Sequence, residues 1–326
     1  MARGTVLVVA VVLIVGCREE KPKPVRVVGL EGSIVDVGEH NLYFDCVGAG
    51  SPTVVVEAGA GGSTRSWQYV RPELAKTTRT CSYDRAGLGG SGEIPGVHDA
   101  ADEIRDLERL LDRADIGPPY VLVGHSYGGL LVRMFAGAHR DDVAAVVLVD
   151  ASHPDQSSRF LAALPRGRPL TALRRDLRLP RVDHGVAVRA SFALAGGVRS
   201  LHDAPLVVIT AGQTGDPNHD LPPAIRRRLD ATWLSLQDGL AHLSTDSVHV
   251  IALRSDHFVQ SFLTGQPDVV VRAVRAVKTA RRPTASPVRA GVPWPRRALR
   301  VNAPTLVSLS STTSSISRAC RTATRR

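Results

Sequence analysis

The sequence has 326 residues, of which 43% are hydrophobic and 22% charged, as is typical of a globular chain with a sizeable buried core. The formal net charge of +10 belongs to the C-terminal segment, because residues 281–326 hold ten arginines and no acid, which leaves residues 1–280 near neutral. The charge is therefore no sign that the folded part binds nucleic acid, and we expect no specific nucleic-acid partner.

The first seventeen residues predict export. Arg3 gives a positive start, and the apolar run Thr5–Val15 is too short to span a bilayer, which needs about 20 residues. Gly16 and Cys17 follow the run. The whole segment resembles a bacterial lipoprotein signal, in which the cysteine, here Cys17, is acylated. The alternative is an ordinary signal peptide that contains a cysteine. Residues 18–26 are polar and rich in proline, as expected of a tether to the membrane surface.

Residues 27–280 are expected to form one α/β domain. Apolar segments that predict strands alternate with segments of helical periodicity, and most of these strands are apolar throughout, which indicates a mostly parallel, doubly wound sheet covered on both faces. The predicted strands are 25–37, 42–47, 53–57, 78–84, 119–124, 143–150, 205–212 and 248–253. Helices are predicted around Trp67–Leu74, after Asp99, from Ser126 and over the apolar stripe Ile225–Leu243.

One interval breaks this alternation. Residues 152–204 separate two predicted strands by about fifty residues, which is long for a single crossover, and we interpret them as an inserted cap. The segment 281–326 is rich in Pro, Ser, Thr and Arg, and we expect it to be disordered.

The stretch Gly124-His125-Ser126-Tyr127-Gly128 has the form G-x-S-x-G and lies between a predicted buried strand and a predicted helix. In that context the serine occupies a sharp turn that raises its hydroxyl above the sheet, and side chains two positions away would collide. The N-terminus of the following helix favours an oxyanion near the serine. The pattern therefore predicts that Ser126 is a catalytic nucleophile.

Residues from about 25 to 280 resemble the α/β-hydrolase superfamily. Besides the G-x-S-x-G turn, the stretches "EAGAGG" (57–62), "YDRAGLGGS" (83–91) and "LRSDHF" (253–258) match loops of this family in order and spacing. The resemblance implies a serine hydrolase of this fold, with an inserted cap. In relatives, the loop that contains Asp84 and Arg85 packs beside the serine turn; a pair between Glu57 and Arg85 is one interpretation of the buried Glu57.

His257 is the candidate general base, since it follows the last predicted sheet strand and so projects from the same edge as Ser126. The acid of the triad is less well defined. In the family it usually follows the strand after the cap, which favours Asp216, with Asp220 as a third choice in the same loop. Some relatives place it one strand earlier, where Asp150 stands, and Asp150 is our second choice.

The oxyanion hole is expected to use the backbone N–H of Tyr127 and a second N–H from the loop after residue 57, with Ala60 preferred and Gly61 the rival. In the family's usual strand order, the strands that hold Cys46 and Cys81 are neighbours, so the resemblance also implies a disulfide between them, which an exported protein would retain.

We therefore expect an exported, lipid-anchored or secreted enzyme of the cell envelope that cleaves an ester or related acyl bond of a small molecule through an acyl-enzyme. Within the same fold, an amidase, peptidase, thioesterase or cofactor-free peroxidase would use the same residues, and a non-enzymatic ligand-binding lipoprotein is the alternative from another class. A serine at position 126 argues against epoxide hydrolase and dehalogenase chemistry, which need an aspartate there. No zinc-protease, paired C-x-x-C or phosphate-loop motif occurs, so neither a cofactor nor a metal is expected.

Overall fold

The computed structural model describes residues 25–26, 32–166, 170–213, 221–279 and 307–308. The predicted signal (1–17), most of the predicted tether and nearly all of the predicted tail lie outside the described residues. Two short strands lie at the edges of the sheet. β1 pairs with β2, and both belong to the predicted strand 25–37; β10, which the sequence did not predict, pairs with β9. No helix in the described part of the chain is long and apolar enough to cross a membrane.

The predicted α/β fold is confirmed. The described strands form one sheet in the order β1-β2-β3-β5-β4-β6-β7-β8-β9-β10, in which β1, β2, β3 and β5 pair antiparallel and all other pairs are parallel. The strands are β1 (Val25–Arg26), β2 (Ser33–Asp36), β3 (Asn41–Val47), β4 (Thr53–Glu57), β5 (Thr80–Tyr83), β6 (Tyr120–His125), β7 (Val143–Val149), β8 (Leu206–Ala211), β9 (Ser247–Ala252) and β10 (Val307–Ser308).

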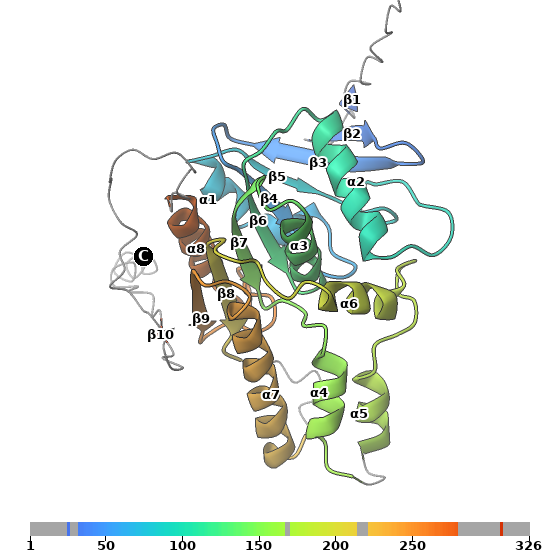
Figure 1. Cartoon of the computed structure of the whole chain (residues 1–326), viewed down its shortest axis with the longest axis vertical. Helices are drawn as coiled ribbons and strands as arrows, with labels where there is room; N and C mark the ends of the chain where they lie inside the picture. The colour runs from blue at the N-terminus through green and yellow to red at the C-terminus, as the bar shows by residue number, and fades with distance from the viewer. Residues whose placement is uncertain (1–24, 27–31, 167–169, 214–220, 280–306, 309–326) are drawn as a thin grey trace, which may run out of the picture.

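Helices cover both faces of the sheet, as the apolar strands predict (Figure 1). The 3-10 helix η1 and helices α1 and α8 pack on one face, and α2, α3, α6 and the end of α7 pack on the other. The helices are η1 (Thr64–Trp67), α1 (Arg71–Ala75), α2 (Ala100–Arg113), α3 (Tyr127–Ala138), α4 (Gln156–Ala163), α5 (Thr171–Asp176), α6 (Val188–Gly196), α7 (Pro223–Ala241) and α8 (Pro267–Thr279).

Two helices show how closely the local pattern determines the structure. Asp99 caps α2 as predicted, and its carboxylate accepts the N–H of Ala101 while the Asp102 side chain accepts the N–H of Asp99. The single helix predicted around Trp67 and Leu74 is instead two short helices, η1 and α1, which keep the same apolar side buried.

The parallel strands in the middle of the sheet are in register. Val149 at the end of β7 pairs with His125 at the end of β6 and with Ile209 near the end of β8. Because parallel strands end at the same edge, residues that directly follow β6, β7 and β9 meet there although they are far apart in the sequence. This carboxyl edge of the sheet is where Ser126, Asp150 and His257 lie.

The segment between β7 and β8, predicted as a cap, holds α4, α5 and α6 and is called the cap segment below (residues 152–204). In Figure 1, α4 and α5 extend beyond the sheet beside the N-terminal half of α7. Helix α6 packs on the body of the domain, where Phe192 and Ala195 are buried in the core. The cap segment is thus fixed to the body at both of its ends and projects in the middle.

The disulfide implied by the resemblance is present: Cys46 of β3 and Cys81 of β5 are bonded, and they are directly opposite each other in the antiparallel pair. The bond closes the chain over a sequence separation of 35 residues that includes β4, η1 and α1. The disulfide therefore constrains the unfolded chain over the whole segment between Cys46 and Cys81.

We expect the double variant Cys46→Ala, Cys81→Ala to lower the free energy of unfolding by about 3–4 kcal/mol, because the open chain regains the entropy of a loop of this length. Urea unfolding of the oxidised wild type, the reduced wild type and the variant measures this difference. The reduced wild type is the control, since it should resemble the variant; equal stability of all three proteins would contradict the expectation.

Candidate active site

Ser126 lies in the sharp turn between β6 and α3, as predicted. Its backbone has φ 52° and ψ −121°, a conformation that a residue with a side chain rarely adopts and that is typical of strained functional turns. The turn is held in place because the Ser126 N–H donates to Val149 O at 3.1 Å, and its carbonyl accepts the N–H of Ser152 at 2.9 Å. The serine therefore stands at the carboxyl edge with its backbone bound to the end of β7 and to the residues that follow it.

The glycines of the motif are required by contacts that the structure makes explicit. A Cβ at Gly124 would lie 2.4 Å from Gly128 O, and a Cβ at Gly128 would lie 2.5 Å from the carbonyl oxygen of Glu57. Both distances are far shorter than van der Waals contact. The atoms that each Cβ would meet belong to packed backbone, which has no room to move. Any side chain at either position would push α3 away from β4 and β6, and the turn at Ser126 would be lost.

His257 follows β9 and is paired with Asp150, the second choice of the sequence analysis. Its Nδ1 lies 2.7 Å from Asp150 Oδ2. Asp216 and Asp220 lie outside the described residues. Asp150 follows β7, the strand adjacent to the Ser126 strand, and its own backbone (φ 42°) turns the carboxylate over the edge of the sheet.

Two further donors hold the Asp150 carboxylate. Oδ1 accepts the N–H of Ala211 at 3.0 Å and the indole N–H of Trp233 at 2.9 Å, while Oδ2 faces His257. Asp150 is 3% exposed, so these three bonds replace the water that a carboxylate would otherwise bind. The arrangement fixes Asp150 in one orientation and directs the His257 Nδ1–H toward it.

His125, the residue before the serine, positions His257. Burial, together with the nearby His257, lowers the pKa of His125 to about 3, so the His125 ring is neutral at physiological pH. Its Nε2–H donates to the backbone carbonyl of His257 at 2.8 Å, and the two ring centroids are 4.6 Å apart. The residue before the serine therefore holds the backbone of the histidine.

The loop expected to supply the oxyanion hole lies against the serine turn. A Cβ at Gly59 would come within 3.2 Å of Ser126 Cβ, which places the Gly59-Ala60 backbone beside the serine. Ala60 is exposed, and among the described residues neither its amide nor that of Tyr127 has a hydrogen-bond acceptor. These two N–H groups belong to the segments that follow the carboxyl ends of β4 and β6, and these two strands pair in register.

A buried charge cluster supports this loop. Arg85 donates to Glu57 Oε1 at 2.6 Å and to the carbonyls of Ala58 and Gly59 at 2.7 and 2.8 Å, so it holds both the carboxylate and the backbone of the oxyanion loop. The pairing of Glu57 with Arg85 that the sequence suggested is thereby confirmed. Burial raises the pKa of Glu57 to about 7, although the guanidinium beside it acts in the opposite direction.

A second carboxylate connects this cluster to the serine turn. Glu103 of α2 pairs with Arg85 Nε at 3.0 Å and accepts the hydroxyl of Tyr127 at 2.5 Å. The Arg85 guanidinium also lies 5.4 Å from the centre of the Tyr127 ring. Arg85 therefore links the two segments that carry the candidate oxyanion donors, and neither the role of Glu103 nor that of the tyrosine hydroxyl was visible in the sequence.

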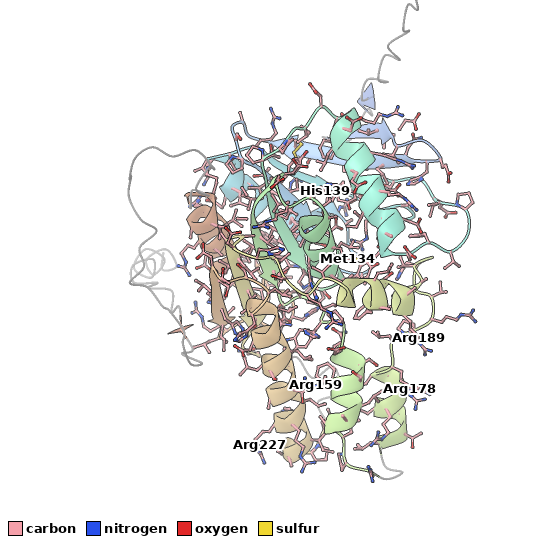
Figure 2. All side chains as sticks on the ribbon, viewed as in Figure 1. Met134, His139, Arg159, Arg178, Arg189 and Arg227 are labelled. Atoms are coloured by element: carbon pink, nitrogen blue, oxygen red, sulfur yellow. A yellow bond between two sulfur atoms is a disulfide. The ribbon has the colours of Figure 1, made fainter. Side chains whose placement is uncertain are left out.

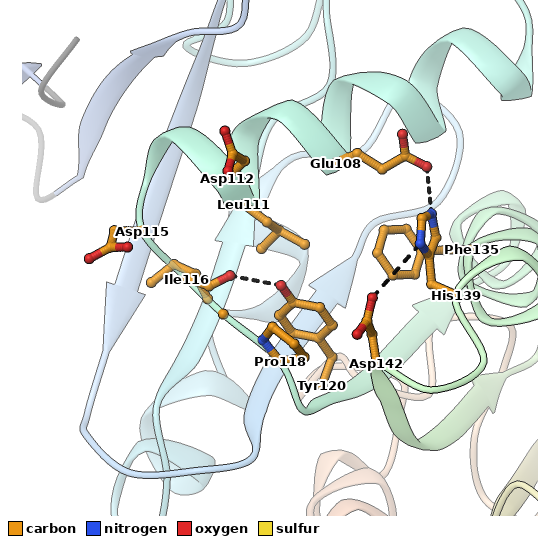
Figure 3. A pocket seen from close by; sticks show the side chains of 11 residues that line it. Glu108, Leu111, Asp112, Asp115, Ile116, Pro118, Tyr120, Phe135, His139 and Asp142 are labelled. Carbon is orange, nitrogen blue, oxygen red and sulfur yellow. Dashed lines mark hydrogen bonds and ion pairs between the residues drawn. The ribbon is translucent and has the colours of Figure 1, made fainter. Parts of the chain in front are cut away.

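The two cavities described in the structure lie away from Ser126 and His257. One, of about 270 Å³, is at the opposite end of β6, where Glu108, Asp142 and His139 line it (Figure 3). The other, of about 470 Å³, lies in the cap segment between Leu161, Leu179 and two arginines, Arg178 and Arg189 (Figure 2). In the part of the chain that is described, no group of three or more His, Cys, Asp or Glu side chains is arranged to hold a metal ion.

Comparison with known proteins assigns the family. The pattern of the family described as "alpha/beta hydrolase fold" matches residues 52–216, just over half of the chain. The chain belongs to the α/β-hydrolase family. The matched residues of this α/β hydrolase include the serine turn, Asp150 and Arg85.

Relatives of the α/β hydrolase agree with this assignment. "Uncharacterized protein YqjL" of Bacillus subtilis is 26% identical over 241 residues, which cover 74% of this chain and 89% of YqjL. "Epoxide hydrolase 3" of Xenopus tropicalis is 31% identical over 135 residues, 39% of this chain and 36% of that protein. Apart from YqjL, the chain spans less than half the length of the curated relatives compared with it.

The enol-lactonase from Burkholderia xenovorans LB400 has the same fold, with a TM-score of 0.53 over 76% of this chain and 100% of that one, at 18% identity. The family and its named members support a hydrolytic function for this α/β hydrolase.

The pKa of His125 predicts how stability of the α/β hydrolase depends on pH. The folded protein keeps His125 neutral down to about pH 3, whereas the unfolded chain takes up this proton near pH 6.5. Between these values the unfolded state binds more protons, so the contribution of His125 to the free energy of unfolding is lost as the pH falls from about 6.5 to 3. We expect His125→Asn, which does not titrate, to flatten this acid limb.

Urea unfolding at a series of pH values measures the slope in wild type and variant. His184→Asn, at an exposed histidine, is the matched control and should keep the wild-type slope. If His125→Asn keeps it as well, the ring is not buried in its neutral form.

Proposed function

We propose that the protein is a serine hydrolase that cleaves an ester or related acyl bond of a small molecule through an acyl-enzyme. Ser126 is the nucleophile, His257 the general base and Asp150 the acid of the triad. The observation that carries the proposal is the hydrogen bond between His257 and the buried Asp150 at the sheet edge where the strained Ser126 turn lies. The hydrolase family of the chain supports the reaction class.

The acid does not take the proton in this mechanism. Asp150 holds the proton of His257 on Nδ1, which leaves Nε2 with a lone pair for the serine proton. Trp233 and Ala211 keep the carboxylate from rotating, so the tautomer of His257 is set by bonds outside the ring. When His257 becomes positively charged during the reaction, the carboxylate stabilises it.

The steps follow from this arrangement. Ser126 Oγ attacks the acyl carbon while its proton passes to His257, and the carbonyl oxygen becomes an oxyanion that accepts the N–H groups of Tyr127 and Ala60. The intermediate collapses as His257 returns the proton to the leaving oxygen, and an alcohol departs. Water then attacks the acyl-enzyme with the same proton relay and releases the acid and free Ser126. Each oxyanion donor is worth about 10²–10³ in rate in such sites.

We also propose that the protein is exported and held at the cell envelope, with Cys17 as the lipid attachment point. The sequence before residue 18 motivates this proposal, and the Cys46–Cys81 disulfide supports it, since such bonds persist in oxidising compartments. Metabolic labelling with a radioactive fatty acid tests it: Cys17→Ser should abolish the label, and label that survives the substitution would refute lipidation at this residue.

We expect Ser126→Ala to abolish both the hydrolysis of short p-nitrophenyl esters and labelling by a fluorophosphonate probe, because these need the serine hydroxyl. The variant should melt like the wild type, since only one oxygen is removed. Ser158→Ala, in the cap segment, is the matched control and should retain both activities. Probe labelling that persists in Ser126→Ala would place the nucleophile elsewhere.

We expect Asp150→Asn to lower kcat by about 10⁴ with little change in the melting temperature. The asparagine oxygen can still accept from Trp233 and Ala211, but its NH₂ group then faces His257 Nδ1 and stabilises the wrong tautomer. Asp216→Asn is the comparison, and kcat should change by no more than a few-fold. Steady-state kinetics on one p-nitrophenyl ester decides between them, and the opposite result would return the role to Asp216.

A further inference from the structure

Large apolar side chains are exposed around His257. In the described part of the chain, eight large hydrophobic residues are exposed, and five of them come from two segments at the carboxyl edge. We call these five the apolar rim: Tyr69 (41% exposed), Leu253 (52%), Phe258 (53%), Phe262 (70%) and Leu263 (84%). The concentration of such residues at one place is what distinguishes the rim from ordinary surface.

The rim is continuous with the candidate active site. Phe258 directly follows His257, and its ring centre lies 5.4 Å from that of His257 and 5.6 Å from that of His125. Phe262 pairs with Tyr69 at 5.6 Å, and Tyr69 follows η1, which begins four residues after Ala60. The rim therefore extends from the base of the proposed triad toward the loop of the oxyanion hole.

The loop that exposes most of the rim is held in place by hydrogen bonds and buried residues. The loop that carries Phe262 and Leu263 is closed by hydrogen bonds between Asp256 N and Thr264 O at 3.1 Å and between Ser261 N and Phe258 O at 2.8 Å. Between the exposed residues, Val259 and Gln260 are 0% and 2% exposed, so the loop is anchored in the core. A side chain at Gly265 would strike Phe258 O at 2.3 Å, which keeps the loop tightly packed.

Leaving these side chains in water forgoes the stabilisation that burial would provide. Monomeric proteins rarely expose contiguous apolar patches larger than a few hundred Å², and patches of that kind mark interaction sites. Neither described cavity is lined by any residue of the rim. A single small ligand is normally bound in an enclosed cleft, and neither of these cavities supplies one at the rim.

The composition of the rim suits a lipid surface. Aromatic rings and leucines enter the boundary between headgroups and acyl chains, and nearby cations pair with phosphates. Arg65 in η1 is exposed next to the rim and supplies such a cation. Charge complementarity with phospholipid headgroups therefore accompanies the apolar contact.

We propose that the apolar rim is a lipid-docking surface: Phe262 and Leu263 enter the headgroup–acyl boundary of a phospholipid bilayer, with Arg65 at the phosphates. This docking presents the Ser126–His257 edge to esters dissolved in the bilayer. The inference about substrate, which rests on the proposed function, is that the enzyme acts on esters with a long acyl chain. The docking itself needs no catalysis and is tested without it.

The test uses the full chain with Cys17→Ser and Ser126→Ala, so that neither a lipid anchor nor turnover contributes. In this background Phe262→Trp places a reporter in the rim, and Leu194→Trp, at an exposed residue of α6, is the matched control. Phosphatidylcholine vesicles that carry spin-labelled acyl chains should shift the emission of the Phe262→Trp protein to the blue and quench it, and should leave that of the control unchanged.

In the same background, Phe262→Asp with Leu263→Asp should weaken vesicle binding by about tenfold or more, since the burial of each side chain is worth about that factor. Val182→Asp with Leu194→Asp, at two exposed apolar residues outside the rim, is the control and should bind like the parent protein. Sedimentation with vesicles gives both partition coefficients.

Equal quenching of both reporters, or equal losses in both pairs of aspartate variants, would overturn the proposal, because binding would not be directed by the rim. So would a Phe262→Trp emission that is already blue-shifted in buffer and protected from iodide, since another segment of the chain would then cover the rim. The two proposals fail separately. If the protein that keeps Ser126 shows no ester hydrolysis but the rim still docks to vesicles, the proposed function is refuted and the docking proposal stands.

Discussion

One buried guanidinium connects most of what the candidate site needs. Arg85 pairs with Glu57 and Glu103, and it also holds the carbonyls of Ala58 and Gly59. Two carboxylates that are almost fully buried have each lost several kcal/mol of hydration, which the attraction to this cation offsets, and breaking such a pair costs about 3–5 kcal/mol. The loop that carries Gly59 and Ala60 is thus held by an interaction that is rarely broken, which keeps the N–H groups of the proposed oxyanion hole in place before substrate arrives.

The remaining geometry follows from the sheet. Ser126, Asp150 and His257 each come directly or within a few residues after a parallel strand, and parallel strands that are in register end together. Precise positions within that edge come from backbone turns: both Ser126 and Asp150 have positive φ. The strands bring the residues together, and the strained turns at their ends orient the side chains.

The sequence predicted the fold and the serine turn because both depend on local pattern: apolar strands, helical periodicity and glycines two residues either side of Ser126. It ranked Asp150, the residue that His257 contacts, second to Asp216. Whether His257 meets a residue after β7 or one after β8 depends on where its ring points, and no local pattern encodes that. Trp233 looked like part of an apolar helical stripe, yet its indole N–H is a buried donor that needs an acceptor, and that acceptor is Asp150.

Trp233 has a second neighbour. Its indole stacks on Phe160 of α4, with ring centres 5.9 Å apart and an angle of 18° between the planes. One face of a single side chain therefore rests on the cap segment, while its nitrogen anchors the acid of the proposed triad. In evolutionary terms, the cap segment cannot be exchanged independently of the rest of the domain. A replacement that alters substrate preference must also supply a flat side chain to stack on this indole. Without one, the indole shifts and the acid of the proposed triad loses its support.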